Sequence, residues 1–246
     1  MSLTIVEVLE RSVQGRTEPY LCRADDGKVY FVKGQSATRQ GLAAEWLCAC
    51  LAERFGLPVA PYCIATVPDE LIEADLTGWL RDLGPGEVFA SRRVAAVDLT
   101  DSHRHLVPEA LRRDIVAFDW WVRNADRNLT AYGGNPNLLW NPEGEGSLVV
   151  IDHNLAFDPE FSPADFLQLH VFADDIRAMF SDYLLREAYA ARFQAALGIW
   201  DEACHNVPDA WRFIDQERTL PVGFSLPAWR NLLERAATDS FWVLPT

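Results

Sequence analysis

The sequence predicts an α+β protein in two parts, a small sheet with one helix followed by a mainly helical part. Three observations lead to this class. Short apolar runs between turn residues fill most of the first ninety positions, a stretch rich in glycine and proline follows over 76–108, and apolar residues at helical spacing dominate beyond it. We therefore expect two domains, residues 1–92 and residues 93–246.

The size and charge of the chain limit what it can do. It has 246 residues, of which 49% are hydrophobic, so it can bury a sizeable core. Its net charge of −14 argues against direct binding to nucleic acid and against an anionic membrane. The sequence contains neither a run of 18 apolar residues nor a secretion-signal pattern. The histidines and five cysteines do not have the spacing of a zinc site. We expect a cytoplasmic protein whose cysteines stay reduced.

The first part contains a strand pair that ends in an unusual lysine. Residues 20–23 and 28–33 are predicted strands, joined by the turn sequence Asp-Asp-Gly. Val29, Phe31 and Lys33 share one face of the second strand, and we expect this face to be the buried one. Lys33 is one of only two lysines among 22 basic residues. A buried amine needs an anion or a route to water, so Lys33 either meets an acid or reaches solvent at the strand end.

A helix is predicted over residues 36–57. Its apolar stripe is formed by Leu42, Trp46, Leu47, Cys50, Leu51 and Phe55. Glu45 lies at the edge of this stripe, where it is either solvated or within reach of a lysine on a neighbouring strand. Residues 58–67 and 86–94 are predicted to complete the sheet.

The second part begins with a helix within 107–124, in which Asp119 neighbours the apolar stripe and is expected to be a packing or capping acid. A polar stretch, NADRNLTAYGGNPNLLW, spans 124–140. A hairpin is predicted from strands 137–140 and 147–152, and its second strand ends at Asp152 after four apolar residues. A carboxylate on such a support suits a metal ligand, although Asp152 could also simply form a turn.

Helices are predicted for the rest of the chain. Ser162 and Pro163 have the residue types of an N-cap and a first helical position. Two or three further helices are expected up to residue 240.

Taken in order, the polar residues match the parts that phosphoryl transfer from ATP requires. A lysine can hold phosphates, a helix glutamate can fix that lysine, and an aspartate can orient the attacking hydroxyl. An asparagine and a second aspartate can hold magnesium against the phosphates. Each residue is a weak signal alone, and the ordered set is more specific.

The same residues give the chain a resemblance to a known family. The segments YFVKG (30–34), AAEWLCACLAERFGLPV (43–59), FDWWVRNADRN (118–128), NPNLLW (135–140) and VVIDHNLAF (149–157) resemble the HipA-like kinases, distant relatives of protein and phosphatidylinositol kinases. The resemblance covers most of residues 30–157. It implies a two-lobed protein-kinase-like fold, with a small sheet-plus-helix N-lobe and a mainly helical C-lobe, that binds ATP and Mg²⁺ in the cleft.

The resemblance also implies roles for individual residues. Lys33 would bind phosphates and Glu45 would pair with it, Asp126 would be the catalytic acid/base, and Asn135 and Asp152 would hold magnesium. The loop over 12–19 takes the place of the phosphate-covering loop, which makes Gly15, Arg16 and Thr17 candidate nucleotide contacts, or else an ordinary turn.

One departure from the family pattern concerns the metal-binding asparagine. The family usually places it five residues after the catalytic aspartate, but here residue 131 is alanine and Asn135 lies nine residues after Asp126. We interpret the difference as a four-residue insertion, which Gly133 and Gly134 allow to fold back toward the metal. A loop that is four residues longer costs little free energy of loop closure. The insertion is therefore expected to affect the geometry of the site more than the stability of the fold.

Three functions are consistent with the sequence. The first is an ATP-dependent kinase that acts on a hydroxyl of a protein or a small molecule, with protein serine or threonine as the expected acceptor. The second is a kinase-like enzyme with other nucleotide chemistry, such as nucleotidyl transfer. The third is a non-catalytic nucleotide-binding or scaffold protein.

Overall fold

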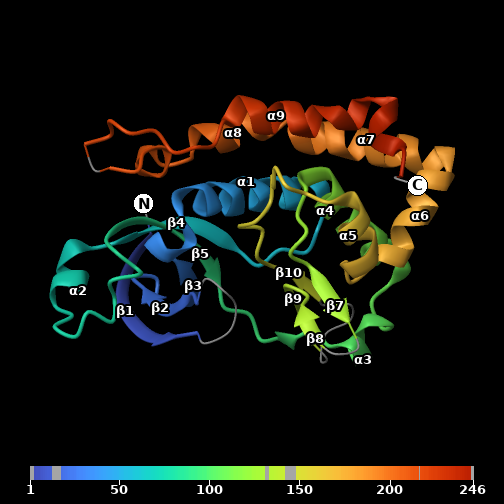
Figure 1. Ribbon diagram of the computed structural model, residues 1–246. Helices are drawn as coiled ribbons and strands as arrows, with labels where there is room; N and C mark the ends of the chain where they lie inside the picture. The colour runs from blue at the N-terminus through green and yellow to red at the C-terminus, as the bar shows by residue number, and fades with distance from the viewer. Residues whose placement is uncertain (1–2, 13–17, 131–132, 142–147, 216, 245–246) are drawn as a thin grey trace. The chain divides into compact units, whose positions relative to one another are not determined.

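The computed structural model describes residues 3–12, 18–130, 133–141, 148–215 and 217–244 (Figure 1). It confirms the α+β class. The chain forms two compact units: unit 1 contains residues 1–46, 60–94 and 206–223, and unit 2 contains residues 47–59, 95–205 and 224–246. The expected division at residue 92 assumed two continuous segments, whereas each compact unit is assembled from separate stretches of chain. The expected division therefore stays a prediction.

Unit 1 is built around a closed five-stranded barrel (Figure 1). Its strands are β1 (Leu3–Arg11), β2 (Tyr20–Ala24), β3 (Val29–Lys33), β4 (Tyr62–Val67) and β5 (Gly86–Arg92). The order around the barrel is β1-β2-β3-β5-β4, and a short parallel pairing of β1 with β4 closes it. The strands expected at 20–23 and 28–33 are confirmed. Strand β1 was not anticipated.

The interior of the barrel holds the opposite face of β3 from the one we expected. Tyr30 and Val32 belong to the buried cluster inside the barrel, whereas Val29 and Phe31 are only half-buried. The expectation that the face of Val29, Phe31 and Lys33 is the buried one was therefore wrong for Val29 and Phe31, although Lys33 itself is buried. A closed barrel fills one face of each strand with its own core, so Lys33 projects outward from the barrel.

Helices and turns surround this barrel within unit 1. They are η1 (Gln35–Ala37), the first half of α1 (Arg39–Phe55), α2 (Asp69–Glu73) and η2 (Asp209–Arg212). The stretch 206–223 joins unit 1 from far along the chain, and there the indole nitrogen of Trp211 donates to the carbonyl of Glu87 at 2.9 Å.

Unit 2 is mainly helical. Its helices are the second half of α1, α3 (Asp101–Arg104), α4 (Glu109–Val122), α5 (Pro163–Leu169), α6 (Ala173–Ser181), α7 (Tyr183–Leu197), α8 (Trp200–His205), α9 (Leu226–Glu234), η3 (Arg235–Ala237) and η4 (Asp239–Trp242). The expected start of α5 is confirmed, because the hydroxyl of Ser162 accepts from the backbone of Asp165.

Two small sheets complete unit 2. The expected hairpin is confirmed as β9 (Leu138–Trp140) paired antiparallel with β10 (Leu148–Val150), and β6 (Val97–Asp98) extends it. A second, unexpected hairpin consists of β7 (Asn128–Thr130) and β8 (Gly133–Asn135). It follows Asp126 and ends at Asn135, the two residues whose spacing departs from the family pattern.

Arginines from the C-terminal helices cap the ends of α1 and α4 in unit 2. Arg192 donates to the carbonyl of Phe55, the last residue of α1, and pairs with Asp114. Arg235 donates to the carbonyls of Trp120 and Trp121 in the last turn of α4. Such carbonyls lack partners within their own helix and favour a cation. The C-terminal segment therefore holds the helix that leads into the polar stretch after residue 122.

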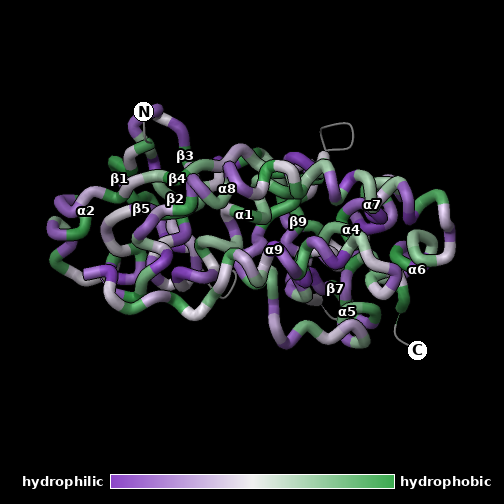
Figure 2. The backbone as a smooth tube through the Cα atoms, turned by 90° about the horizontal axis from the view of Figure 1, so that it is seen from above, coloured by the Kyte–Doolittle hydropathy of each residue, from purple (hydrophilic) through white to green (hydrophobic). Residues whose placement is uncertain are grey.

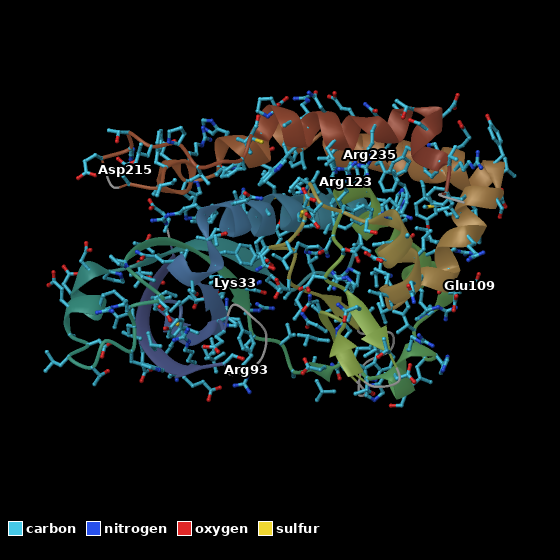
Figure 3. The ribbon with its side chains drawn as sticks, in the orientation of Figure 1. Lys33, Arg93, Glu109, Arg123, Asp215 and Arg235 are labelled. Atoms are coloured by element: carbon cyan, nitrogen blue, oxygen red, sulfur yellow. The ribbon has the colours of Figure 1, made fainter. Side chains whose placement is uncertain are left out.

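The cap on α4 is buried. Burial lowers the pKa of Arg235 to about 9, and the nearby charge of Arg123 acts in the same direction. Figure 3 shows both side chains at this end of α4.

Hydrophobic and hydrophilic residues are interspersed along the coloured parts of the chain in Figure 2. Accordingly, within the described residues no helix has the length and apolar character needed to cross a membrane.

Candidate active site

Lys33 forms an ion pair with Glu45 inside unit 1. Its ammonium lies 2.9 Å from a carboxylate oxygen of Glu45, and the two residues are only 8% and 5% exposed (Figure 3 labels Lys33). Lys33 ends β3 and Glu45 lies on α1, so the pair joins the barrel to the helix. This excludes both alternatives considered from the sequence, a snorkelling Lys33 and a solvated Glu45. The phosphate-binding role of the pair stays a prediction.

The residue after Lys33 explains why the strand ends where it does. A Cβ on Gly34 would lie 2.1 Å from the carbonyl oxygen of Leu83, so only glycine allows this approach of two backbones. The backbone of Gln35 then donates to the same carbonyl. This close contact fixes the end of β3 and with it the starting point of the Lys33 side chain.

Asp126 follows α4 after a sharp change of backbone direction. The helix ends at Val122, and Arg123 adopts a left-handed conformation with φ of 55°. Asp126 is half-buried, and its carboxylate oxygen Oδ2 receives two side-chain N–H groups, from Asn135 at 3.2 Å and from Asn137 at 3.1 Å. The structure thus brings Asp126 and Asn135 together despite the longer spacing in the sequence.

Asn137 differs from what we expected. The predicted hairpin begins its first strand at Asn137. Strand β9 instead begins at Leu138, and Asn137 adopts a left-handed backbone with φ of 49°. Asparagine tolerates this conformation better than most residues. The turn directs the side chain of Asn137 to Asp126, where it bonds both the carboxylate and the main-chain carbonyl.

The described residues on both sides of the insertion pair as a hairpin. Asn128 pairs with Asn135 across β7 and β8, and the Asn128 side-chain oxygen also accepts from the backbone of Asn135 at 3.2 Å. Gly133 has φ of 109°, which confirms that this position needs glycine. Gly134 is required for a different reason, since a Cβ there would lie 2.5 Å from the carbonyl oxygen of Asn128. The hairpin therefore returns Asn135 to Asp126.

Asp152 lies in the turn just after β10. Its φ is 60°, in the left-handed region, which aspartate adopts more readily than most residues other than glycine. The backbone of Ile151, the preceding residue, donates to the carbonyl of Asn137 at 3.1 Å, which connects this turn to the Asn135 segment. The turn after Asp152 is also tied to α4, because the backbone of Phe157 donates to the carbonyl of Val122.

Asn135 and Asp152 are suitable in chemistry for magnesium, which prefers oxygen ligands. The amide nitrogen of Asn135 donates to Asp126, so the amide oxygen of Asn135 points away from that carboxylate. No group of three or more acidic, histidine or cysteine side chains that could hold a metal ion is found within the described residues. Two protein ligands are nevertheless what magnesium uses when substrate phosphates and water supply the rest.

Behind these residues lies a buried network centred on Arg127. Its guanidinium is fully buried and contacts the carboxylate of Asp119 at 2.6 Å. It also donates to the carbonyls of Pro136, Asn137 and Ile151. The last contact is with Nε2 of His153 at 3.2 Å, and because arginine only donates, this nitrogen is the acceptor.

Asp119 is the anion of this network. Burial by itself raises the pKa of its carboxyl, but Arg127 and His170 outweigh that effect and hold the pKa well below its usual range. His170 donates from Nε2 to Asp119 at 2.9 Å and accepts at Nδ1 from the backbone of Phe172, which defines a neutral ring. Burial lowers the pKa of His170 below its ordinary value, even though Asp119 opposes the shift.

Sequence reasoning missed the role of this network. It treated Asp119 as a packing or capping acid and left Arg127 without a role of its own. A signal was present, since an ionisable residue next to a helical apolar stripe is rarely fully buried unless it is paired. The candidate nucleotide contacts Gly15, Arg16 and Thr17 lie outside the described residues, so their prediction stays open.

One unit contains a buried lysine–glutamate pair, and the other contains an aspartate held by two asparagines and a second aspartate in a turn after β10. Residues of these types, in this chain order, are the ones that phosphoryl transfer from ATP calls for. The model of the HipA-like kinase family matches residues 5–244, nearly the whole chain. The chain belongs to the HipA-like kinase family.

Two solved structures that are similar to this chain are a kinase and a much longer protein. The proinflammatory kinase CtkA of Helicobacter pylori is similar with a TM-score of 0.51 and 12% identity, over 96% of this chain and 93% of that one. The open conformation of CtTel1 matches 94% of this chain but 12% of its own length, at 14% identity and a TM-score of 0.29. None of the curated proteins compared with this chain matches it. The likeness to CtkA supports a kinase-like fold.

Proposed function

We propose that this protein transfers the γ-phosphoryl group of ATP to a hydroxyl group, with protein serine or threonine as the acceptor. Membership of the HipA-like kinase family supports the reaction class. The strongest support is the contact of Asn135 with the carboxylate of Asp126. The proposed reaction needs the acid/base and the magnesium ligand close together, and this contact joins them although four extra residues separate them in the sequence.

Each residue has a defined part in the proposed step. Lys33, fixed by Glu45, binds the phosphates of ATP. Asp126 orients the acceptor hydroxyl and takes its proton. The hydroxyl oxygen forms the new bond to the γ-phosphorus while the bond to the bridging oxygen breaks, and that electron pair leaves with ADP.

The carboxylate of Asp126 is prepared for this role by its two amide donors. They fix its orientation through Oδ2. Asn135 and Asp152 would hold Mg²⁺, which neutralises charge on the phosphates when it is bound.

The test is an assay with ATP labelled in either the γ- or the α-phosphate, in the presence of magnesium and an array of serine- and threonine-containing peptides. The proposal expects label from the γ-phosphate on the peptides or on the protein itself, and its loss in Asp126→Asn. Transfer of the α-phosphate would indicate nucleotidyl transfer instead.

A binding measurement separates the third possibility from a failed assay. Saturation with Mg-ATP at 100 times Kd should stabilise the protein by about 2.7 kcal/mol, visible as a higher Tm. Stabilisation without transfer would indicate a non-catalytic nucleotide-binding protein. Absence of both would contradict the proposal as a whole.

A further inference from the structure

Arg127 is the most deeply buried charged residue in the neighbourhood of Asp126. Its side chain is 0% exposed, and the side chain of its counter-ion Asp119 is 1% exposed. Removing a cation from water carries a large cost, and a buried ion pair often recovers no net stability from it. The fold therefore needs another reason to keep Arg127 here, and its remaining contacts supply one.

Those contacts are to the backbone of two other segments. The nitrogen Nη1 donates to Pro136 at 3.1 Å, to Ile151 at 3.3 Å and also to the carbonyl of Asn137. Nη2 meets His153, two residues beyond Ile151. One planar group thus holds a point in each of the two segments that contain the candidate metal ligands.

The held points are the immediate neighbours of the site residues. Arg127 itself follows Asp126, Pro136 follows Asn135, and Ile151 precedes Asp152. A backbone carbonyl fixed at one residue limits the position of the next to within one peptide unit. The three site residues therefore share a single anchor.

We propose that Arg127 is a positioning residue that sets the distance of Asp126 from Asn135 and Asp152. The proposal rests on the proposed function for these three residues. Arg127 touches neither ATP nor the acceptor in this assignment and acts only through the backbone that it holds.

Asp119 and its own partners complete the device. The carboxylate bonds Nε of Arg127 through Oδ2, while Asn124 donates to Oδ1 and His170 to Oδ2. These contacts fix the plane of the guanidinium, which has five donors in a rigid fork. A lysine at position 127 would keep the charge, but its single ammonium cannot replace the three nitrogens that separately meet Asp119, the backbone carbonyls and His153.

The experiment compares Arg127→Lys with Arg192→Lys. Arg192 is a matched control, because it also pairs with an aspartate and donates to a backbone carbonyl in unit 2, but it caps α1. Both variants are measured for kcat, for KM of ATP and for the magnesium concentration at half-maximal rate. A metal-dependent shift of Tm with a non-hydrolysable ATP analogue gives a second readout that does not need turnover.

Arg127→Lys is expected to lower kcat by about 10²-fold, the scale of a 1 Å misplacement. It should weaken apparent magnesium affinity by about 10- to 100-fold, the range for lost outer-shell partners of a metal site. The KM of ATP should change little. Arg192→Lys should lower Tm without changing the magnesium requirement.

Hydrogen exchange tests the anchoring directly. In Arg127→Lys, amides within 133–140 and 148–157 should exchange faster, while those of β2 and β3 keep their wild-type rates. If Arg127→Lys does not fold, Asp119→Asn takes its place, since it keeps the shape of the side chain and removes the counter-charge.

The outcomes separate this proposal from the proposed function. Unchanged exchange in both segments together with an unchanged magnesium requirement overturns the positioning role. A parallel loss in Arg127→Lys and Arg192→Lys, in proportion to their Tm, shows a purely structural role and also overturns it. A wild-type protein without transfer activity contradicts the proposed function, and the exchange result then still decides whether Arg127 anchors the two segments.

Discussion

Asn137 holds Asp126 by two hydrogen bonds from one side-chain amide, 3.1 Å to the carboxylate and 3.2 Å to the main-chain carbonyl. Asn135 reaches the same carboxylate oxygen with a single bond. The two asparagines therefore have different tasks in the proposed mechanism. Asn137 is buried and fixes the aspartate, while Asn135 has an amide oxygen directed elsewhere.

The two tasks predict different kinetic changes. Asn135→Ala is expected to raise the magnesium requirement, because it removes a proposed ligand. Asn137→Ala is expected to lower kcat by about 10²-fold with little change in that requirement, since it misplaces the acid/base. Magnesium titrations of turnover in both variants measure the difference, and Asn231→Ala, at an exposed position on α9, serves as the control. Equal magnesium requirements in the first two variants would contradict the assignment.

Asp126→Asn should lower kcat by about 10²- to 10⁴-fold, the usual contribution of a general acid or base. ATP affinity should remain close to that of the wild type, because in the proposed mechanism Asp126 acts on the acceptor and not on ATP. Turnover and ATP-analogue binding by calorimetry check both parts. Asp165→Asn, an exposed change on α5, is the control. A folded Asp126→Asn protein with undiminished turnover would remove Asp126 from the mechanism.

Lys33→Met should weaken ATP binding and abolish most turnover, because it removes the cation that Glu45 holds in place. The chain offers a strict control, since Lys28 is its only other lysine and is exposed in the same unit. Lys28→Met should leave both quantities unchanged. ATP titrations of the two variants provide the measurement, and the same affinity in both would show that Lys33 is a purely structural charge.

The sequence allowed the elements around the site to be predicted because their signals are local. The turn before β3, the apolar stripe of α1, the Ser162 N-cap and the β9–β10 hairpin each depend on neighbouring residues. Barrel closure depends instead on pairing β1 with β4, some sixty residues apart. No local pattern records such a pairing, so the interior face of β3 was assigned to the wrong side.

The same distinction holds for the site. Lys33, Glu45, Asp126, Asn135 and Asp152 were named from residue type and order, and the structure joins the first two and the next two. The network of Arg127 could not be named in this way, because three of its acceptors are backbone carbonyls. Every residue has a backbone carbonyl, so residue types do not indicate which carbonyls a buried guanidinium contacts. Only the fold determines this.

The buried histidine on Asp119 predicts how stability depends on pH. The pKa of His170 is lowered in the folded protein, so the unfolded chain binds its proton more tightly. Stability is therefore fully present above the ordinary pKa of 6.5 and falls as the pH drops below it. The lowered pKa of Asp119 adds a further loss below its ordinary value of 3.8.

Urea unfolding of the wild type and of His170→Gln between pH 7.5 and 5 checks this dependence. Glutamine can still donate to Asp119 but does not titrate, so the variant should be less stable at pH 7.5 and should lose less stability on acidification. A steeper loss in the variant than in the wild type would show that other groups cause the acid sensitivity.

The hairpin β7–β8 gives the last prediction, because it carries Asn135 across the insertion. A Cβ at Gly134 would lie 2.5 Å from the carbonyl oxygen of Asn128 and 2.9 Å from the Cα of Leu129, both of which are backbone atoms. Backbone atoms cannot move aside as a flexible side chain can, so Gly134→Ala must displace one strand of the hairpin. Such overpacking typically costs about 1–3 kcal/mol of stability.

The displacement should reach the neighbouring residue. Asn135 bonds Asn128 through its backbone and Asp126 through its side chain, and both bonds need the present register. We therefore expect Gly134→Ala to raise the magnesium requirement in the same direction as Asn135→Ala. Gly223→Ala is the control, because a Cβ there meets no atom within 4 Å and its backbone conformation is an ordinary one. If Gly134→Ala lost stability but kept the wild-type magnesium requirement, the hairpin would not be what places Asn135 at the metal.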